Sequence, residues 1–268
     1  MISIAAAFLK RDFLIALSYR LAFLLEISGI FFGVASFYFL SRLFGSALVP
    51  QLEQYGGDYF SFVLIGLAFN GYLGLSLYSF AGSIREGQMT GTLEIMLLSP
   101  TRLSAILFSS SLWEYVLTTL NVVVYFLFGG LVFGFDISQT NFLTAFVVLI
   151  ISITAFSGIG ILSAAFVLVV KRGDPIAWIF GGVSTLLAGV YYPISVLPGW
   201  LEPLSHALPM TYSLDAMRLA MLRGYSLYEV RYDILILLGF ALVLTPLAFI
   251  VFRKALKRAK AEGSLIQY

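Results

Sequence analysis

The residue types that carry out chemistry are scarce in this 268-residue sequence, which has one histidine and no cysteine. Without cysteine there is neither a disulfide nor a thiolate metal site, and we expect no metal. The single histidine, His206, lies in a proline-rich segment without the pattern of a catalytic triad. We therefore interpret His206 as a residue of the membrane interface.

Two carboxylates, Glu26 and Glu114, interrupt stretches that are otherwise apolar. Ionised groups are costly inside a bilayer, so such residues commonly belong to functional sites. Glu26 follows Arg20 by only six residues, which is about 9 Å along a helix. Two interpretations remain: ion pairs with Arg20 or Arg102 near the cytoplasmic interface, or a cytoplasmic substrate gate.

The composition indicates which elements position these residues, because 60% of the chain is hydrophobic and only 11% is charged. Soluble domains have about 25% charged residues, so we predict an all-α integral membrane protein that forms one domain, residues 1–268. Six stretches are long enough to cross a bilayer. They are Leu21–Ser41, Tyr59–Ile84, Leu103–Phe135, Ile137–Val170, Pro175–Tyr192 and Ile234–Phe252. Within them, Gly66, Gly71, Gly74, Gly158 and Gly160 are expected to permit close approach of helices.

Basic residues predict the orientation of this bundle. With both termini in the cytoplasm, twelve of the sixteen Lys and Arg residues lie inside and four, Arg42, Arg218, Arg223 and Arg231, lie outside. This asymmetry follows the positive-inside rule and predicts a multi-pass protein of the cell inner membrane. Residues 1–20 predict an amphipathic interface helix, and residues 253–268 a basic cytoplasmic tail. The net charge of +2 does not suggest nucleic-acid binding.

The cytoplasmic connection at residues 83–100 is long for a turn. Thr90 to Thr92 offers capping residues for a short helix, on which Leu93, Met96 and Leu97 share one face. Pro100 would end that helix. From the residues alone, the segment either docks into a groove of a partner protein or rests among lipid headgroups.

The segment at residues 193–223, on the outer side, is too apolar for a free loop and too rich in proline for a continuous helix. We predict short helices that re-enter the outer leaflet, provided that protein covers their backbone. The residues that mark this segment are Pro193, Pro198, Trp200 and Pro209.

These two segments resemble the permease subunits of type-2 ABC exporters. One match comprises Glu86, Gly91-Thr92-Leu93-Glu94, Leu97-Leu98 and Ser99-Pro100, and the other comprises Tyr192-Pro193-Ile194-Ser195, Leu197-Pro198, Trp200-Leu201, Leu204, Leu208-Pro209 and Asp215 to Arg218. The resemblance implies that residues 83–100 include a coupling helix. Its implied ATPase-docking residues are Arg85, Glu86, Leu93, Glu94, Met96 and Leu97.

The resemblance also implies partners for this chain, which contains no G-x-x-x-x-G-K-[ST] phosphate loop. A separate nucleotide-binding ATPase subunit would hold ATP and Mg, while this chain would bind no cofactor and would not be an enzyme by itself. A second copy or a homologous permease would complete a translocation path, surrounded by membrane lipid, for a drug, a lipid or a glycan.

Two other functions are open to a bundle of membrane helices. An ion-gradient-driven secondary transporter typically has substrate and ion sites near the bilayer midplane, where suitable carboxylates are missing unless Glu26 or Glu114 lies deeper. A membrane enzyme acting on lipids would need a cluster of acidic residues and histidines at one face, which the sequence does not show.

Overall fold

A computed structural model describes residues 2–44, 49–91, 103–170 and 174–261, and all regular structure in these residues is helical. The elements are α1 (Ile2–Ser18), α2 (Arg20–Phe44), α3 (Val49–Leu52), η1 (Glu53–Tyr55), α4 (Tyr59–Met89), α6 (Leu103–Leu131), α7 (Phe142–Val170), α8 (Pro175–Leu187), η2 (Ile194–Val196), α9 (Glu202–Ser205), α10 (Pro209–Leu222) and α11 (Arg231–Ala261). The predicted all-helical class is confirmed.

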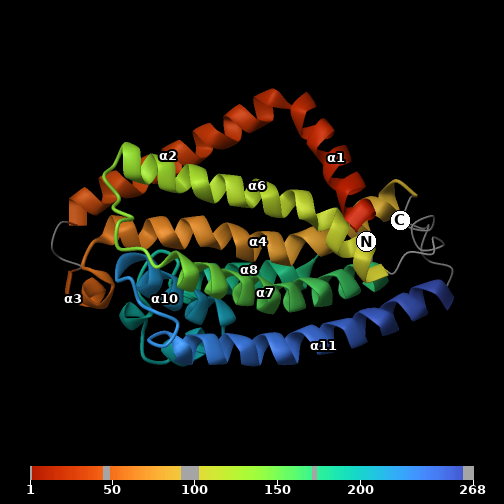
Figure 1. The fold of residues 1–268 in the computed structure, drawn as a ribbon. Coiled ribbons are helices and arrows are strands. Elements are labelled where there is room, and N and C mark those ends of the chain that lie inside the picture. Colours follow the sequence, from red (N-terminus) through yellow and green to blue (C-terminus); the bar gives the residue numbers. More distant parts are fainter. Residues whose placement is uncertain (1, 45–48, 92–102, 171–173, 262–268) are drawn as a thin grey trace.

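The long helices form an elongated bundle with α4 and α7 at its centre (Figure 1). The beginning of α1 and the end of α11 lie at one end, which we call the inner end (Figure 1). The opposite end, called the outer end, carries α3 and α10 (Figure 1). Helices α1 and α2 meet in a bend (Figure 1). Both are inclined to α6, so that the bend lies away from α6 while the other ends of α1 and α2 lie close to the bundle.

Five helices of the described residues are long and apolar enough to cross a membrane: α2, α4, α6, α7 and α11. The predicted fifth span, Pro175–Tyr192, is helical only over the 13 residues of α8. Such a helix extends about 20 Å, short of the ~30 Å hydrocarbon core. Its helical geometry ends at Ala188, and Gly189 has a φ of +84°. The predicted count of six spans is therefore not confirmed, because five of the described helices are long enough to cross a membrane and α8 is not.

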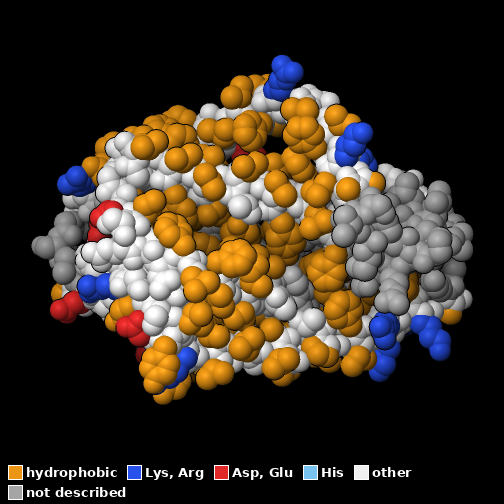
Figure 2. Space-filling view, in the orientation of Figure 1, with side chains coloured by type: hydrophobic (Ala, Val, Ile, Leu, Met, Phe, Trp, Pro, Cys, Tyr) orange, Lys and Arg blue, Asp and Glu red, His pale blue; other side chains and the backbone are white. Residues whose placement is uncertain are grey.

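Burial distinguishes α4 and α7 from the other spans. In the most apolar window of each helix, 67% of the residues of α4 and 50% of those of α7 are buried, against 11% in α2 and α6 and 17% in α11. Apolar side chains cover much of the visible face (Figure 2). Because lipid tails are as apolar as these side chains, such exposure is ordinary for a membrane bundle. Helices α4 and α7 thus form the core around which the other helices are arranged.

Two glycines allow α7 to pack closely against its neighbours. A Cβ at Gly160 would lie 1.8 Å from the Ser76 carbonyl oxygen of α4, and one at Gly158 would lie 2.8 Å from Cβ of Leu244 in α11. The prediction of close helix approach is confirmed at these positions and, as described below, at Gly66. It is wrong for Gly74, where an added Cβ would meet nothing within 4 Å.

Helix α4 is longer at its inner end than the predicted span. The sequence interpretation ended the span at Ile84, whereas the helix continues to Met89. Thr90 is its C-cap, and the Thr90 hydroxyl donates to the Glu86 carbonyl oxygen at 2.8 Å. Gly91 follows with a φ of +68°. Thr90 therefore ends a long helix, and residues 83–89, predicted as part of the coupling segment, belong to α4.

Candidate functional site

A buried arginine joins three segments at the outer end. Arg218 of α10 is 2% exposed. Its Nε donates to the Phe62 carbonyl oxygen of α4 at 3.1 Å, and its Nη2 donates to the Val190 carbonyl oxygen at 3.1 Å. The guanidinium carbon lies 3.4 Å from the centroid of the Phe62 ring. One side chain thereby ties α10 to α4 and to the turn after α8.

Glycine permits this close arrangement. A Cβ at Gly66 would lie 2.2 Å from the Val190 carbonyl oxygen and 2.7 Å from Nη2 of Arg218. Even alanine at Gly66 would therefore push the turn and the guanidinium away from α4. Gly189, at the start of that turn, has a positive φ that side-chain-bearing residues rarely adopt. Both glycines are needed to bring Val190 to Arg218.

A second polar contact binds α10 to the segment that precedes α4. The Tyr55 hydroxyl donates to Oδ1 of Asp215 at 2.5 Å, and Asp215 lies three residues before Arg218 on α10. Burial, followed by the nearby Asp215 carboxylate, raises the pKa of Tyr55. The phenol therefore stays protonated at neutral pH and remains a donor to Asp215.

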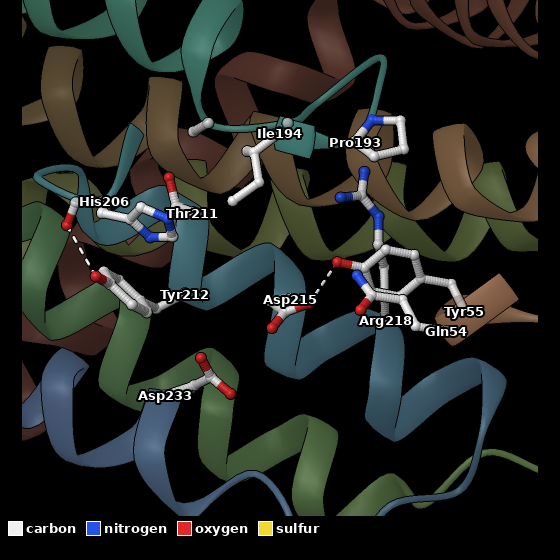
Figure 3. A pocket seen from close by; sticks show the side chains of 12 residues that line it. Gln54, Tyr55, Pro193, Ile194, His206, Thr211, Tyr212, Asp215, Arg218 and Asp233 are labelled. Atoms are coloured by element: carbon white, nitrogen blue, oxygen red, sulfur yellow. Dashed lines mark hydrogen bonds between the residues drawn. The ribbon is translucent and has the colours of Figure 1, made fainter. Parts of the chain in front are cut away.

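These residues face a polar cavity of about 260 Å³ that Asp233 and His206 also line (Figure 3). The Tyr212 hydroxyl, on the same wall, donates to the His206 carbonyl oxygen at 2.9 Å. Burial lowers the pKa of Arg218 to about 9, which leaves the guanidinium charged at pH 7. The cavity thus combines one fixed cation with carboxylates from α10 and α11. This arrangement can hold the outer elements together, but it offers no aligned nucleophile and base.

Of the four residues predicted to mark the outer segment, one lines this cavity. Pro193 precedes η2 and lines the cavity, and Pro209 begins α10. Pro198 accepts a backbone hydrogen bond from Leu201 at 2.8 Å, and Trp200 is 73% exposed. Helix α10 packs against α4, α7 and α11. Protein therefore covers this short helix, while its re-entry into the outer leaflet stays a prediction.

Comparison with known families decides the class of the protein. The family model for the ABC-2 type transporter matches residues 5–222. The chain belongs to the ABC-2 type transporter family. A search of curated proteins finds no match. Together with its apolar helices, membership makes this ABC-2 chain a multi-pass membrane component of an ABC transporter. The match begins within α1 and ends with α10, so it includes both segments that carried the resemblance.

The ABC-2 chain has two carboxylates, Glu26 and Glu114, within helices that are able to span a membrane. Glu26 of α2 accepts a hydrogen bond from Nδ2 of Asn121 in α6 at 2.7 Å. Arg20 and Glu26 line the same groove, about 550 Å³ in volume. Glu114 lines two neighbouring cavities, and its predicted partner Arg102 lies outside the described residues. Whether these groups act as ion pairs or as a gate stays a prediction.

The predicted ATPase-docking residues divide into two groups. Arg85 and Glu86 lie on the last turns of α4, where both are exposed. The other four, Leu93, Glu94, Met96 and Leu97, lie outside the described residues. Their role therefore stays a prediction.

Sequence reasoning missed the network of Tyr55, Asp215 and Arg218. It placed Arg218 among the outside basic residues and Asp215 in the family stretch, without linking either to Tyr55. Asp215 and Arg218 are three residues apart and share a helix face, so their spacing alone could have predicted that they face the same site. Tyr55 lies 160 residues from Asp215 in sequence, and no local pattern connects them.

Proposed function

We propose that this chain is the permease subunit of an ATP-driven exporter. Two permeases, either two copies or this chain with a homologue, enclose a path for a drug, a lipid or a glycan. A separate ATPase subunit, holding ATP and Mg, binds at the inner end and drives the path open. The observation that carries this proposal is the ABC-2 family match over residues 5–222.

Helix α4 is suited to transmit force between the ends of the bundle. Its 31 residues extend about 46 Å. Its inner end leads directly into the predicted docking segment, while Arg218 holds its outer end through Phe62. Close-packed interiors transmit displacement because they have little free volume. An ATPase that moves the docking segment would therefore shift α4 and disturb the polar contacts at the outer end.

The short helix α8 supports the presence of a second permease. Its exposed apolar residues include Trp178 at 75%, Ile179 at 52% and Leu186 at 59%. The turn after α8 is itself buried in this chain, where Ala188 and Val190 are 2% and 0% exposed, so the surface that remains uncovered is the apolar face of α8. A second permease packed on that face would bury it, and lipid would cover much of the outside of the bundle.

We place the inner end in the cytoplasm and the chain in the inner membrane. The beginning of α1 and the end of α11 share that end (Figure 1), as the predicted cytoplasmic position of both termini requires. Arg253, Lys254 and Lys257 lie exposed on the last turns of α11 there. This distribution agrees with the positive-inside rule.

Reconstitution with the ATPase subunit tests the proposal. In proteoliposomes, the wild-type chain should co-purify with the ATPase and stimulate its ATP turnover. The double variant Leu93→Glu, Leu97→Glu should insert normally but lose stimulation, because buried carboxylates would disrupt an apolar contact. The matched variant Leu93→Met, Leu97→Met should retain it. Full stimulation by the glutamate variant, or transport by the purified chain without ATPase, would refute the proposal.

A further inference from the structure

We propose that the groove between the α1–α2 bend and α6 binds an amphipathic organic cation, with its apolar body against α1, α2 and α6 and its charged group near Glu114. This proposal rests on the permease function proposed above and names the cargo class. Figure 2 shows an opening between the α1–α2 bend and α6, with acidic atoms inside it.

The groove is formed by three adjoining cavities. The first, of about 550 Å³, is lined mainly by apolar side chains of α1, α2 and α6, including Phe13, Leu17 and Trp113. Trp113 also lines the second, of about 360 Å³, together with Glu86 and Glu114. Those two carboxylates also line the third, of about 430 Å³. An apolar compartment therefore adjoins an acidic one.

The apolar compartment suits a drug-sized body. Its volume of about 550 Å³ lies within the range of roughly 300–1,000 Å³ typical of small-molecule sites. The Phe13 and Trp113 rings meet edge to face at 5.7 Å between centroids and join α1 to α6. Aromatic rings offer both apolar contact and attraction for a nearby cation.

The charged side chains that line the groove, among the described residues, favour a cation over an anion. Four acidic residues, Asp12, Glu26, Glu86 and Glu114, face two basic ones, Arg11 and Arg20. Arg11 and Asp12 form an ion pair of 2.7 Å and neutralise each other. Three carboxylates then remain against one guanidinium. An anionic headgroup would be repelled at the acidic end, whereas an ammonium group would be attracted.

Two further observations point to a polar occupant. The hydroxyl of Ser79, in the cavity with Glu86 and Glu114, is buried without a hydrogen-bond partner. It can accept a hydrogen bond from an ammonium group. Glu26 and Glu114 are also exposed on helices that can span the membrane. Carboxylates facing lipid are strongly disfavoured, so lipid alone does not cover this face, and water or a polar ligand fits it better.

Two probes of the same shape and opposite charge test the proposal. Equilibrium dialysis measures tetraphenylphosphonium and tetraphenylborate binding to the purified chain in nanodiscs, with empty nanodiscs subtracted. The wild-type chain should bind the phosphonium saturably and the borate at least ten-fold more weakly. Glu114→Gln should weaken phosphonium binding about ten-fold, as expected when one charge of a partly desolvated pair is removed. The control Glu53→Gln, an exposed carboxylate at the outer end, should bind as the wild type does.

A variant that fills the groove tests whether the probe binds inside it, independently of charge. Ala16→Phe, in the wall shared by the first two cavities, should reduce phosphonium binding without changing the net charge. Equal binding of the two probes, or phosphonium binding unchanged in both Glu114→Gln and Ala16→Phe, would overturn the cation site. If binding follows the proposal but the chain fails to stimulate any ATPase subunit, the permease proposal fails and the site stands.

Discussion

Replacing Arg218 by methionine tests the structural role of the outer-end network. The substitution keeps an unbranched side chain but removes both hydrogen bonds, to Phe62 and Val190. Hydrogen bonds from a charged donor contribute about 1.5–3 kcal/mol each. Loss of two, partly offset because no buried charge remains to be desolvated, should lower the free energy of unfolding by about 3 kcal/mol.

Thermal unfolding of the purified chain in detergent measures this effect. For a chain of this size, about 3 kcal/mol corresponds to a fall in Tm of roughly 6–12 °C. Arg218→Lys should give a smaller fall, because an ammonium retains the charge but cannot reproduce the forked geometry of the guanidinium. Arg231→Met is the matched control, since the interactions of Arg231 within the described residues are with its near neighbours Tyr228 and Tyr232, and its Tm should stay within about 2 °C. A Tm for Arg218→Met equal to that of the wild type would refute the reasoning.

Two further predictions concern packing and orientation. Gly160→Ala should reduce the free energy of unfolding by about 1–3 kcal/mol, because the added Cβ would lie 1.8 Å from the Ser76 carbonyl oxygen. Gly182→Ala, where a Cβ meets nothing within 4 Å, should stay within about 0.5 kcal/mol, and equal losses in a denaturant titration would contradict this explanation. Because the chain has no cysteine, a cysteine introduced at exposed Gln139 should react with a membrane-impermeant maleimide in intact cells, and one at exposed Lys257 should react only after permeabilisation. The reverse labelling pattern would invert the proposed orientation.

The sequence predicted the long helices because a bilayer imposes a strong length and composition constraint. It predicted Pro175–Tyr192 as a full span because hydropathy does not register where a helix ends. Asp174 is the N-cap of α8 and accepts a hydrogen bond from the backbone nitrogen of Ala177, and the helix is followed by Gly189 in a left-handed conformation. The apolar residues after Leu187 therefore enter a turn, although their composition suits a helix.

The polar sites were harder to predict for a different reason. Glu26 and Glu114 were recognisable because charge is rare in spans, but the partner of Glu26 is Asn121, on another helix. Arg218 depends on Phe62, Val190 and the space left by Gly66. Such contacts arise from tertiary packing between distant segments, and spacing along a single helix cannot specify them.

The central claim is that ATPase action at the inner end changes the outer end through α4. A single cysteine at Ile194, which lines the outer cavity, allows a direct measurement of maleimide labelling in proteoliposomes containing the ATPase subunit. The labelling rate should change several-fold between the nucleotide-free and the vanadate-trapped states. The change should disappear when Leu93→Glu and Leu97→Glu are added. Equal labelling rates in the two states, or a nucleotide-dependent change that survives those substitutions, would contradict the account.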